Sequence, residues 1–112
     1  MATTPDTVIY LLDQLTQLGT RVRTRKMFGE YAMCCDEKVV ALICDNQLFL
    51  KITPASTLYL GEKSKLGSPY PGAKDHHLIG GEIIENKDAF ASLIIATAES
   101  LPRPIPKKLK NR

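Results

Sequence analysis

Hydrophobic positions recur at two different spacings along this chain, and the change of spacing separates its first two predicted elements. In residues 6–18 the apolar positions lie three and four residues apart, which predicts an amphipathic helix with Asp6 as its N-cap. Gly19 follows as the residue that ends this helix. From Arg21 the spacing falls to two, which is the period of a half-exposed strand.

Four strands are expected between residues 21 and 52, joined by short turns. The first leads to a bend at Gly29, and the second covers residues 30–35. A polar turn at 36–38 precedes residues 39–44, which are all apolar and predict a central strand covered on both faces. Asp45 and Asn46 form a two-residue hairpin signal before the strand 48–52. This segment therefore predicts an antiparallel meander.

The second half of the chain returns to helices. Thr53-Pro54 predicts the start of a short helix, and the glycines and prolines of residues 62–75 predict a surface loop. Residues 76–85 are expected as a strand with a kink at Gly80-Gly81, after which Asn86 caps a last helix. The order α-β-β-β-β-α-β-α predicts a two-layer α+β fold with an antiparallel sheet of about five strands. We expect one domain over residues 1–101 and a flexible, proline-rich basic tail at 102–112.

Charge and composition narrow the class of protein. The net charge is +3, but the cations concentrate in the tail and in residues 21–26, so the whole-surface basic field of a dedicated DNA-binding domain is missing. The first residues do not resemble a signal peptide, the longest apolar run is far too short to cross a membrane, and three cysteines make no disulfide framework. We therefore expect a cytoplasmic protein with reduced thiols and no membrane partner.

Cysteine and histidine pairs are the first candidates for chemistry. Cys34-Cys35 with Cys44, and His76-His77, are conceivable metal ligands, but adjacent residues of a strand point to opposite faces and do not easily share one ion. The cysteines also lie in strands without a neighbouring cation or helix N-terminus to activate them. We expect buried thiols, with no metal, no cofactor and no catalytic residue. A small enzyme of unrecognised type is the weaker alternative.

A basic stripe opens the meander and is the candidate contact surface. Three arginines at alternate positions can grip carboxylates of a protein partner or phosphates. The competing interpretation is a solvated edge strand whose charges discourage aggregation. The expected partner-binding residues are Arg21, Arg23, Arg25, Lys26, Met27 and Phe28. The apolar strand 39–44, with few helices to cover it, also predicts a homodimer.

Several segments of this meander resemble the TfoX N-terminal domain family, the Sxy/TfoX-type proteins linked to regulation of natural competence. They are Arg25-Lys26-Met27-Phe28-Gly29, the apolar run 39–43, and Gln47-Leu48-Phe49-Leu50-Lys51, followed by Thr53-Pro54. The resemblance spans residues 6–98 and implies a two-layer α+β domain similar to that of secretion chaperones. It identifies no catalytic residues.

The sequence departs from the family pattern at two places. The longer competence regulators carry a second, helical domain where this sequence has its basic tail, and Asp36-Glu37 lacks the expected turn glycine. The resemblance implies a non-enzymatic regulatory module that acts on transcription or competence through protein partners. The alternative is direct nucleic-acid binding by the stripe from Arg21 to Lys26 and the tail, with an affinity that falls steeply with salt.

Overall fold

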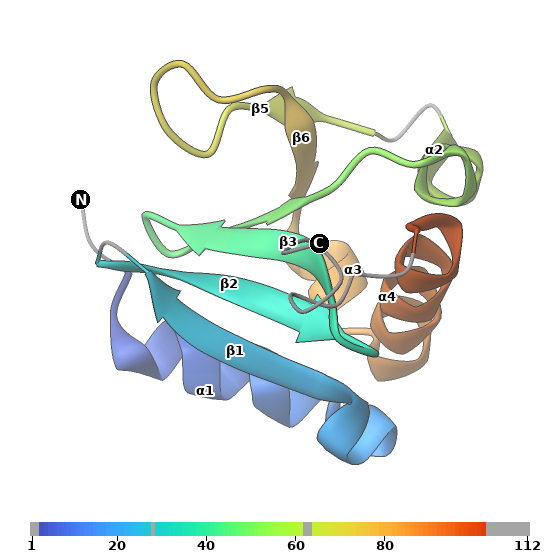
Figure 1. Cartoon of the computed structure of the whole chain (residues 1–112). Coiled ribbons are helices and arrows are strands. Elements are labelled where there is room, and N and C mark those ends of the chain that lie inside the picture. The colour runs from blue at the N-terminus through green and yellow to red at the C-terminus, as the bar shows by residue number, and fades with distance from the viewer. Residues whose placement is uncertain (1–2, 28, 62–63, 103–112) are drawn as a thin grey trace, which may run out of the picture.

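The fold is α+β, with one antiparallel sheet and helices packed against it (Figure 1). The computed structural model describes residues 3–27, 29–61 and 64–102. The elements in chain order are α1 (Pro5–Gln14), the 3-10 helix η1 (Thr16–Arg21), β1 (Val22–Met27), β2 (Glu30–Cys35), β3 (Lys38–Cys44), β4 (Gln47–Leu50), α2 (Pro54–Leu60), β5 (Leu66–Gly67), β6 (His76–Ile79), α3 (Gly81–Ile84) and α4 (Lys87–Ser100). The predicted fold class is confirmed.

The sheet contains six strands in the order β1-β2-β3-β4-β6-β5. The first four form the expected meander, with Met33 opposite Thr24 on one side and Ala41 on the other. The sixth strand is β5, a two-residue element inside the segment that was expected as a loop. Because β1 pairs with β2 and lies at the end of this order, one of its sides is an edge of the sheet.

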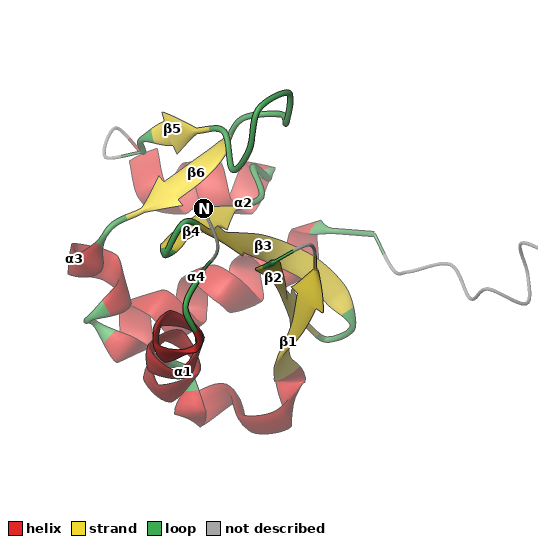
Figure 2. Cartoon of the chain, turned by 90° about the vertical axis from the view of Figure 1, so that its left-hand side faces the viewer, coloured by secondary structure: helices red, strands yellow, loops and turns green. Residues whose placement is uncertain are grey.

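Helices cover one face of the first three strands. Figure 2 shows α1 and α4 on the same side of β1, β2 and β3. The core on this side includes Leu15, Met33, Ile43, Leu50 and Phe90, all at most 1 % exposed. Full burial of such a side chain contributes about 1.5–3 kcal/mol. This packing fixes the sheet on which the candidate site is built.

The opposite face of β1–β3, here called the outer face, has no helix against it among the described residues (Figure 2). Val39 and Leu42 point to this face and are half-buried, whereas Val40, Ala41 and Ile43 join the core. Helices therefore cover only one face of the segment 39–44, although its composition predicted cover on both. A strand that is apolar throughout need not lie between two helical layers.

Two hairpin turns adopt backbone angles that L-residues rarely take. Asp45 and Asn46 have φ angles of 52° and 60°, which confirms the predicted hairpin. Asp36 and Glu37 have φ angles of 52° and 70° although neither is glycine. Asn46 is held by its side-chain oxygen, which accepts a hydrogen bond from the Thr4 backbone N–H at 2.9 Å. Glu37 has no comparable hydrogen bond within the described residues and bears the conformational cost alone.

The first helix differs from its prediction at both ends. Asp6 is not the N-cap, because α1 begins at Pro5 after Thr4, and proline suits the first helical position. Asp6 lies in the first turn, where its negative charge interacts favourably with the positive end of the helix dipole. The helix ends at Gln14 rather than near residue 18, and Gly19, with φ 54°, lies within the following η1.

The strand expected over residues 76–85 is shorter than predicted. It ends at Ile79, and the chain turns into α3, where the Glu85 N–H donates to the Gly81 carbonyl at 2.8 Å. The helix starts at Thr53 and Asn86 are confirmed. Thr53 forms a capping box, and the Asn86 side chain accepts from the α4 backbone.

Candidate functional site on the edge strand and outer face

The structure separates the six residues of the predicted basic stripe. Arg23, Arg25 and Met27 alternate along β1 and share the outer face, opposite Cys34, Ala32 and Glu30 of β2 respectively. Lys26 has the opposite orientation in the same strand. Arg21 is not in the strand but is the last residue of η1. Phe28 lies outside the described residues.

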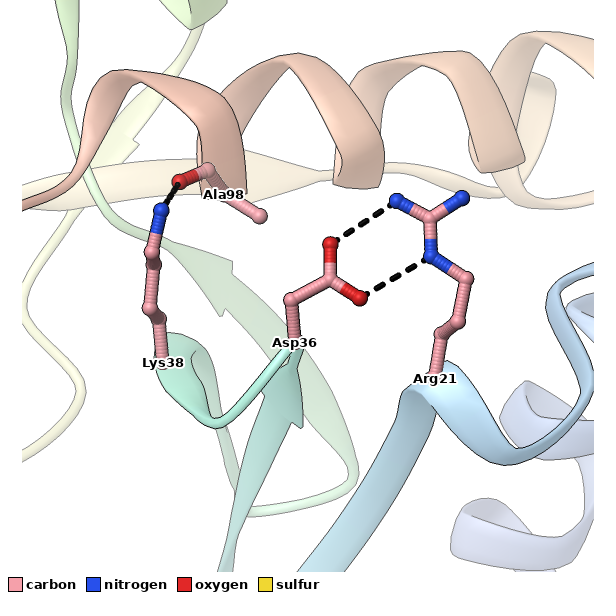
Figure 3. Close-up of polar contacts among 4 residues, drawn as sticks. All are labelled: Arg21, Asp36, Lys38 and Ala98. Carbon is pink, nitrogen blue, oxygen red and sulfur yellow. Dashed lines mark hydrogen bonds and ion pairs between the residues drawn. The ribbon is translucent and has the colours of Figure 1, made fainter. Parts of the chain in front are cut away.

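The guanidinium of Arg21 is paired with the carboxylate of Asp36, in the turn between β2 and β3 (Figure 3). Its Nε and Nη2 atoms donate to the two carboxylate oxygens of Asp36 at 2.9 and 2.8 Å, and the Asp36 N–H donates to the Arg21 carbonyl at 2.9 Å. Hydrogen bonding from the guanidinium lowers the pKa of Asp36, and the same pair raises the pKa of Arg21 further above its ordinary value. Arg21 therefore orders the turn, and its guanidinium, although 45 % exposed, is already paired with a carboxylate.

The same turn is fixed on its other side by Lys38. The Nζ atom of Lys38 donates to the carbonyl of Ala98 at 2.7 Å, near the C-terminal end of α4 (Figure 3). A cation suits that position because the C-terminal end of a helix is its negative end, and the Ala98 carbonyl accepts from Lys38 as well as from the Leu101 N–H at 3.2 Å. The turn between β2 and β3 is thus held between η1 and α4 by two long-range polar contacts.

Arg23 and Arg25 are the available guanidinium groups of the stripe. The Arg23 side chain is 71 % exposed, and its closest carboxylate is that of Glu37, 75 % exposed, at 3.9 Å. A pair that long and that exposed contributes little to stability. Arg25 is exposed and forms no ion pair within the described part of the chain. These two side chains can receive carboxylates without breaking a strong contact.

A shallow hollow of about 410 Å³ lies beside these arginines on the outer face. Arg23 and Arg25 line it together with Cys34, Val39 and Glu37. It combines guanidinium groups with an apolar floor and a carboxylate, so its charge is mixed rather than uniformly positive. A carboxylate among the arginines makes this hollow less suited to a continuous row of phosphates, whereas arginine is enriched in protein–protein interfaces.

The cysteines show no sign of activation. Cys35 and Cys44 are buried, and burial raises the pKa of both thiols, which keeps them protonated and weakly nucleophilic. Cys34 is half-buried on the outer face. Among the described residues, no three His, Cys, Asp or Glu side chains are grouped so that they could hold a metal ion.

A buried histidine network escaped the sequence analysis. His77 is 2 % exposed, with its Nδ1 atom 2.8 Å from Ser64 Oγ and its Nε2 atom 3.1 Å from Ser56 Oγ. Burial lowers the pKa of His77, which favours the neutral ring. Ser56 is fully buried and also belongs to the capping box of α2. A serine–histidine pair so enclosed is structural, because a substrate has no access to Ser56. No regular spacing links these three residues in the sequence, so only the folded structure reveals the contact.

Comparison with known proteins finds the same family that the sequence segments resemble. The model of a family described as the TfoX N-terminal domain matches residues 13–101. A protein of Spirochaeta aurantia, named "Uncharacterized 12.7 kDa protein in trpE 5'region", is 41 % identical over 114 residues, covering 100 % of this chain and 95 % of its own length. Within the described ranges, no helix has both the length and the hydropathy needed to cross a membrane.

Proposed function

This chain belongs to the TfoX N-terminal domain family, and from that premise we propose that it is a non-enzymatic regulatory module that binds an acidic protein partner through Arg23 and Arg25. Its regulatory role concerns transcription or competence, as the family resemblance implies. The partner contacts the exposed side of β1 and the neighbouring outer face. We propose no enzymatic activity for this chain.

One observation carries the proposal. Of the three alternating arginines, Arg21 is neutralised by Asp36, while Arg23 and Arg25 project together from an edge strand with their guanidinium groups exposed. Guanidinium groups bind carboxylates through two parallel hydrogen bonds, so two of them in a row favour an acidic surface. Met27 adds an apolar neighbour that is 37 % exposed, and methionine is enriched in protein interfaces.

Direct nucleic-acid binding is the weaker candidate. Glu37 lies 3.9 Å from Arg23, and its charge would repel a phosphate backbone. Such binding would weaken steeply with salt, in proportion to the phosphates neutralised. Self-association stays a separate prediction, supported by half-buried Val39 and Leu42 on the outer face. A monomeric light-scattering mass at micromolar concentration would contradict it.

The test is a pull-down from the native cytosol with two matched charge reversals. Arg23→Glu with Arg25→Glu changes the proposed contact, and Lys74→Glu with Lys87→Glu makes the same change in net charge at exposed positions elsewhere. We expect the first pair to lose the partner and the second to keep it, with both variants folded by circular dichroism. Nuclease treatment of the lysate separates protein partners from nucleic acid. If the variant with Arg23→Glu and Arg25→Glu retains every partner, the proposal is refuted.

A further inference from the structure

The backbone of β1 presents an open hydrogen-bonding edge. Pairs in an antiparallel ladder alternate between hydrogen-bonded and non-hydrogen-bonded. Just before β1, the carbonyl of Arg21 accepts from the N–H of Asp36, so the pairs made by residues 23, 25 and 27 in the continuous register are the hydrogen-bonded ones. The N–H and C=O groups of Val22, Thr24 and Lys26 therefore point away from β2, and of these the Val22 N–H already donates to the Gly19 carbonyl. Among the described residues, no strand pairs with that side of β1.

We propose that an extended acidic segment of the partner adds antiparallel to β1 as a further strand of the sheet. This inference rests on the proposed function and specifies how the acidic partner binds. The intervening residue of the segment pairs with the backbone of Thr24. The residues on either side of it lie opposite Arg23 and Arg25, in non-hydrogen-bonded pairs, where the strands bring side chains closest.

The side-chain pattern of β1 matches an alternating acidic sequence. Arg23 and Arg25 share the outer face, so carboxylates two residues apart in the added strand meet both guanidinium groups at once. The hollow of about 410 Å³ next to these arginines leaves room for the side chains of the segment. Main-chain hydrogen bonds supply affinity in this mode of binding, and the paired charges supply specificity.

In the register centred on Thr24, a second copy of the chain is disfavoured at this edge. An antiparallel pair of β1 strands centred on Thr24 would place Arg23 of each copy opposite Arg25 of the other. Like charges directly opposite one another destabilise a sheet. The charges that keep the edges of two copies apart thus select an acidic strand. This joins the two interpretations of the stripe, since protection against self-pairing and recognition of a partner use the same residues.

Backbone-methylated peptides test the strand pairing directly. The probe is acetyl-Thr-Glu-Val-Glu-Thr-amide, whose central valine pairs with Thr24 while its two glutamates face Arg25 and Arg23. N-methylation of the valine removes an N–H that points toward β1, whereas N-methylation of one glutamate removes an N–H that points to solvent. By isothermal titration calorimetry at low salt, we expect the first to weaken binding about tenfold or more and the second to leave it within about twofold.

Two variants of the full chain provide the reciprocal test. Thr24→Pro removes the outward N–H without removing a bond to β2, and proline is tolerated on a strand edge. Thr24→Val keeps the N–H and the shape of the side chain. We expect only the proline variant to lose the peptide. Thermal unfolding checks that both are folded, and if the proline variant is not, the methylated peptides decide.

The outcomes separate the two proposals. Equal binding of the valine-methylated and unmodified peptides, or no binding of either at low salt, would overturn strand addition. The pull-down with Arg23→Glu and Arg25→Glu decides the acidic partner independently. Loss of the partner there, combined with indifference to backbone methylation, would leave the proposed function standing and assign the contact to side chains alone.

Discussion

Glu37 offers the sharpest single test, because it combines backbone strain with a charge at the proposed site. Its φ of 70° is left-handed, which costs a non-glycine residue roughly 1–2 kcal/mol. Glycine relieves that cost but gives back about 0.5–1 kcal/mol through the greater freedom of the unfolded chain. The lost contact with Arg23, at 3.9 Å between exposed side chains, contributes little. We therefore expect Glu37→Gly to raise the free energy of unfolding by about 0.75 kcal/mol, the middle of a range of about 0–1.5 kcal/mol.

Glu37→Gln is the matched control, since it removes the charge and keeps the strained backbone. Its stability should stay close to that of the parent chain. Both variants remove a carboxylate beside Arg23, so both should bind the acidic peptide more tightly, by about twofold to fivefold. Urea unfolding measures the first effect and calorimetric titration the second.

The two claims about Glu37, that its backbone is strained and that its carboxylate competes for Arg23, can be refuted independently. A glycine variant less stable than the glutamine variant would refute the argument from backbone strain. Unchanged or weaker peptide binding by both variants would refute the claim that Glu37 competes for Arg23. If both claims hold, the two variants bind the peptide with the same affinity, and the glycine variant has the higher free energy of unfolding.

Three further predictions concern contacts that hold the fold. Burial lowers the pKa of His77, so the unfolded chain binds a proton more readily than the folded chain, and stability should fall as the pH drops below the ordinary value of 6.5. His77→Gln should therefore reduce the decline in urea midpoint between pH 8 and pH 5. An unchanged decline in the variant would contradict this role of His77. Lys38→Met removes the donor to Ala98 and should cost about 0.5–1.5 kcal/mol in calorimetry, whereas no change would mean that the contact is dispensable. Asn46→Ala loses its hydrogen bonds to the start of α1 at a φ of 60° and should cost about 1–3 kcal/mol in urea unfolding, while Asn46→Gly should cost less; the reverse order would contradict this reasoning.

Signals confined to a few neighbouring residues predicted their elements well. Asp45-Asn46 forms its hairpin and Thr53-Pro54 starts its helix, because turn angles and capping bonds depend on the residues involved and little else. Asn86 caps α4 for the same reason. The fold class followed from the order of these elements and the change in hydrophobic spacing.

Elements whose limits depend on distant contacts were predicted less well. Residues 76–85 look like one strand, yet β6 ends at Ile79 where its pairing with β4 ends, and α3 follows. The strand β5 is two residues long and exists only because it pairs with β6. The kink expected at Gly80-Gly81 coincides with the end of β6, but no local signal showed that the chain continues there as a helix or that β5 forms.

The sequence by itself determined that this protein is an α+β domain with a basic strand at the start of a meander, because spacing and turn chemistry are local properties. Only the tertiary structure decided which cations of the predicted stripe are already paired with a carboxylate. Arg21, Arg23 and Arg25 are equivalent in the pattern, but the fold brings Asp36 against Arg21 and leaves the other two exposed on an open edge. A strand's own residues set its two faces, whereas its neighbours in the sheet decide which edge and which charges remain unpaired.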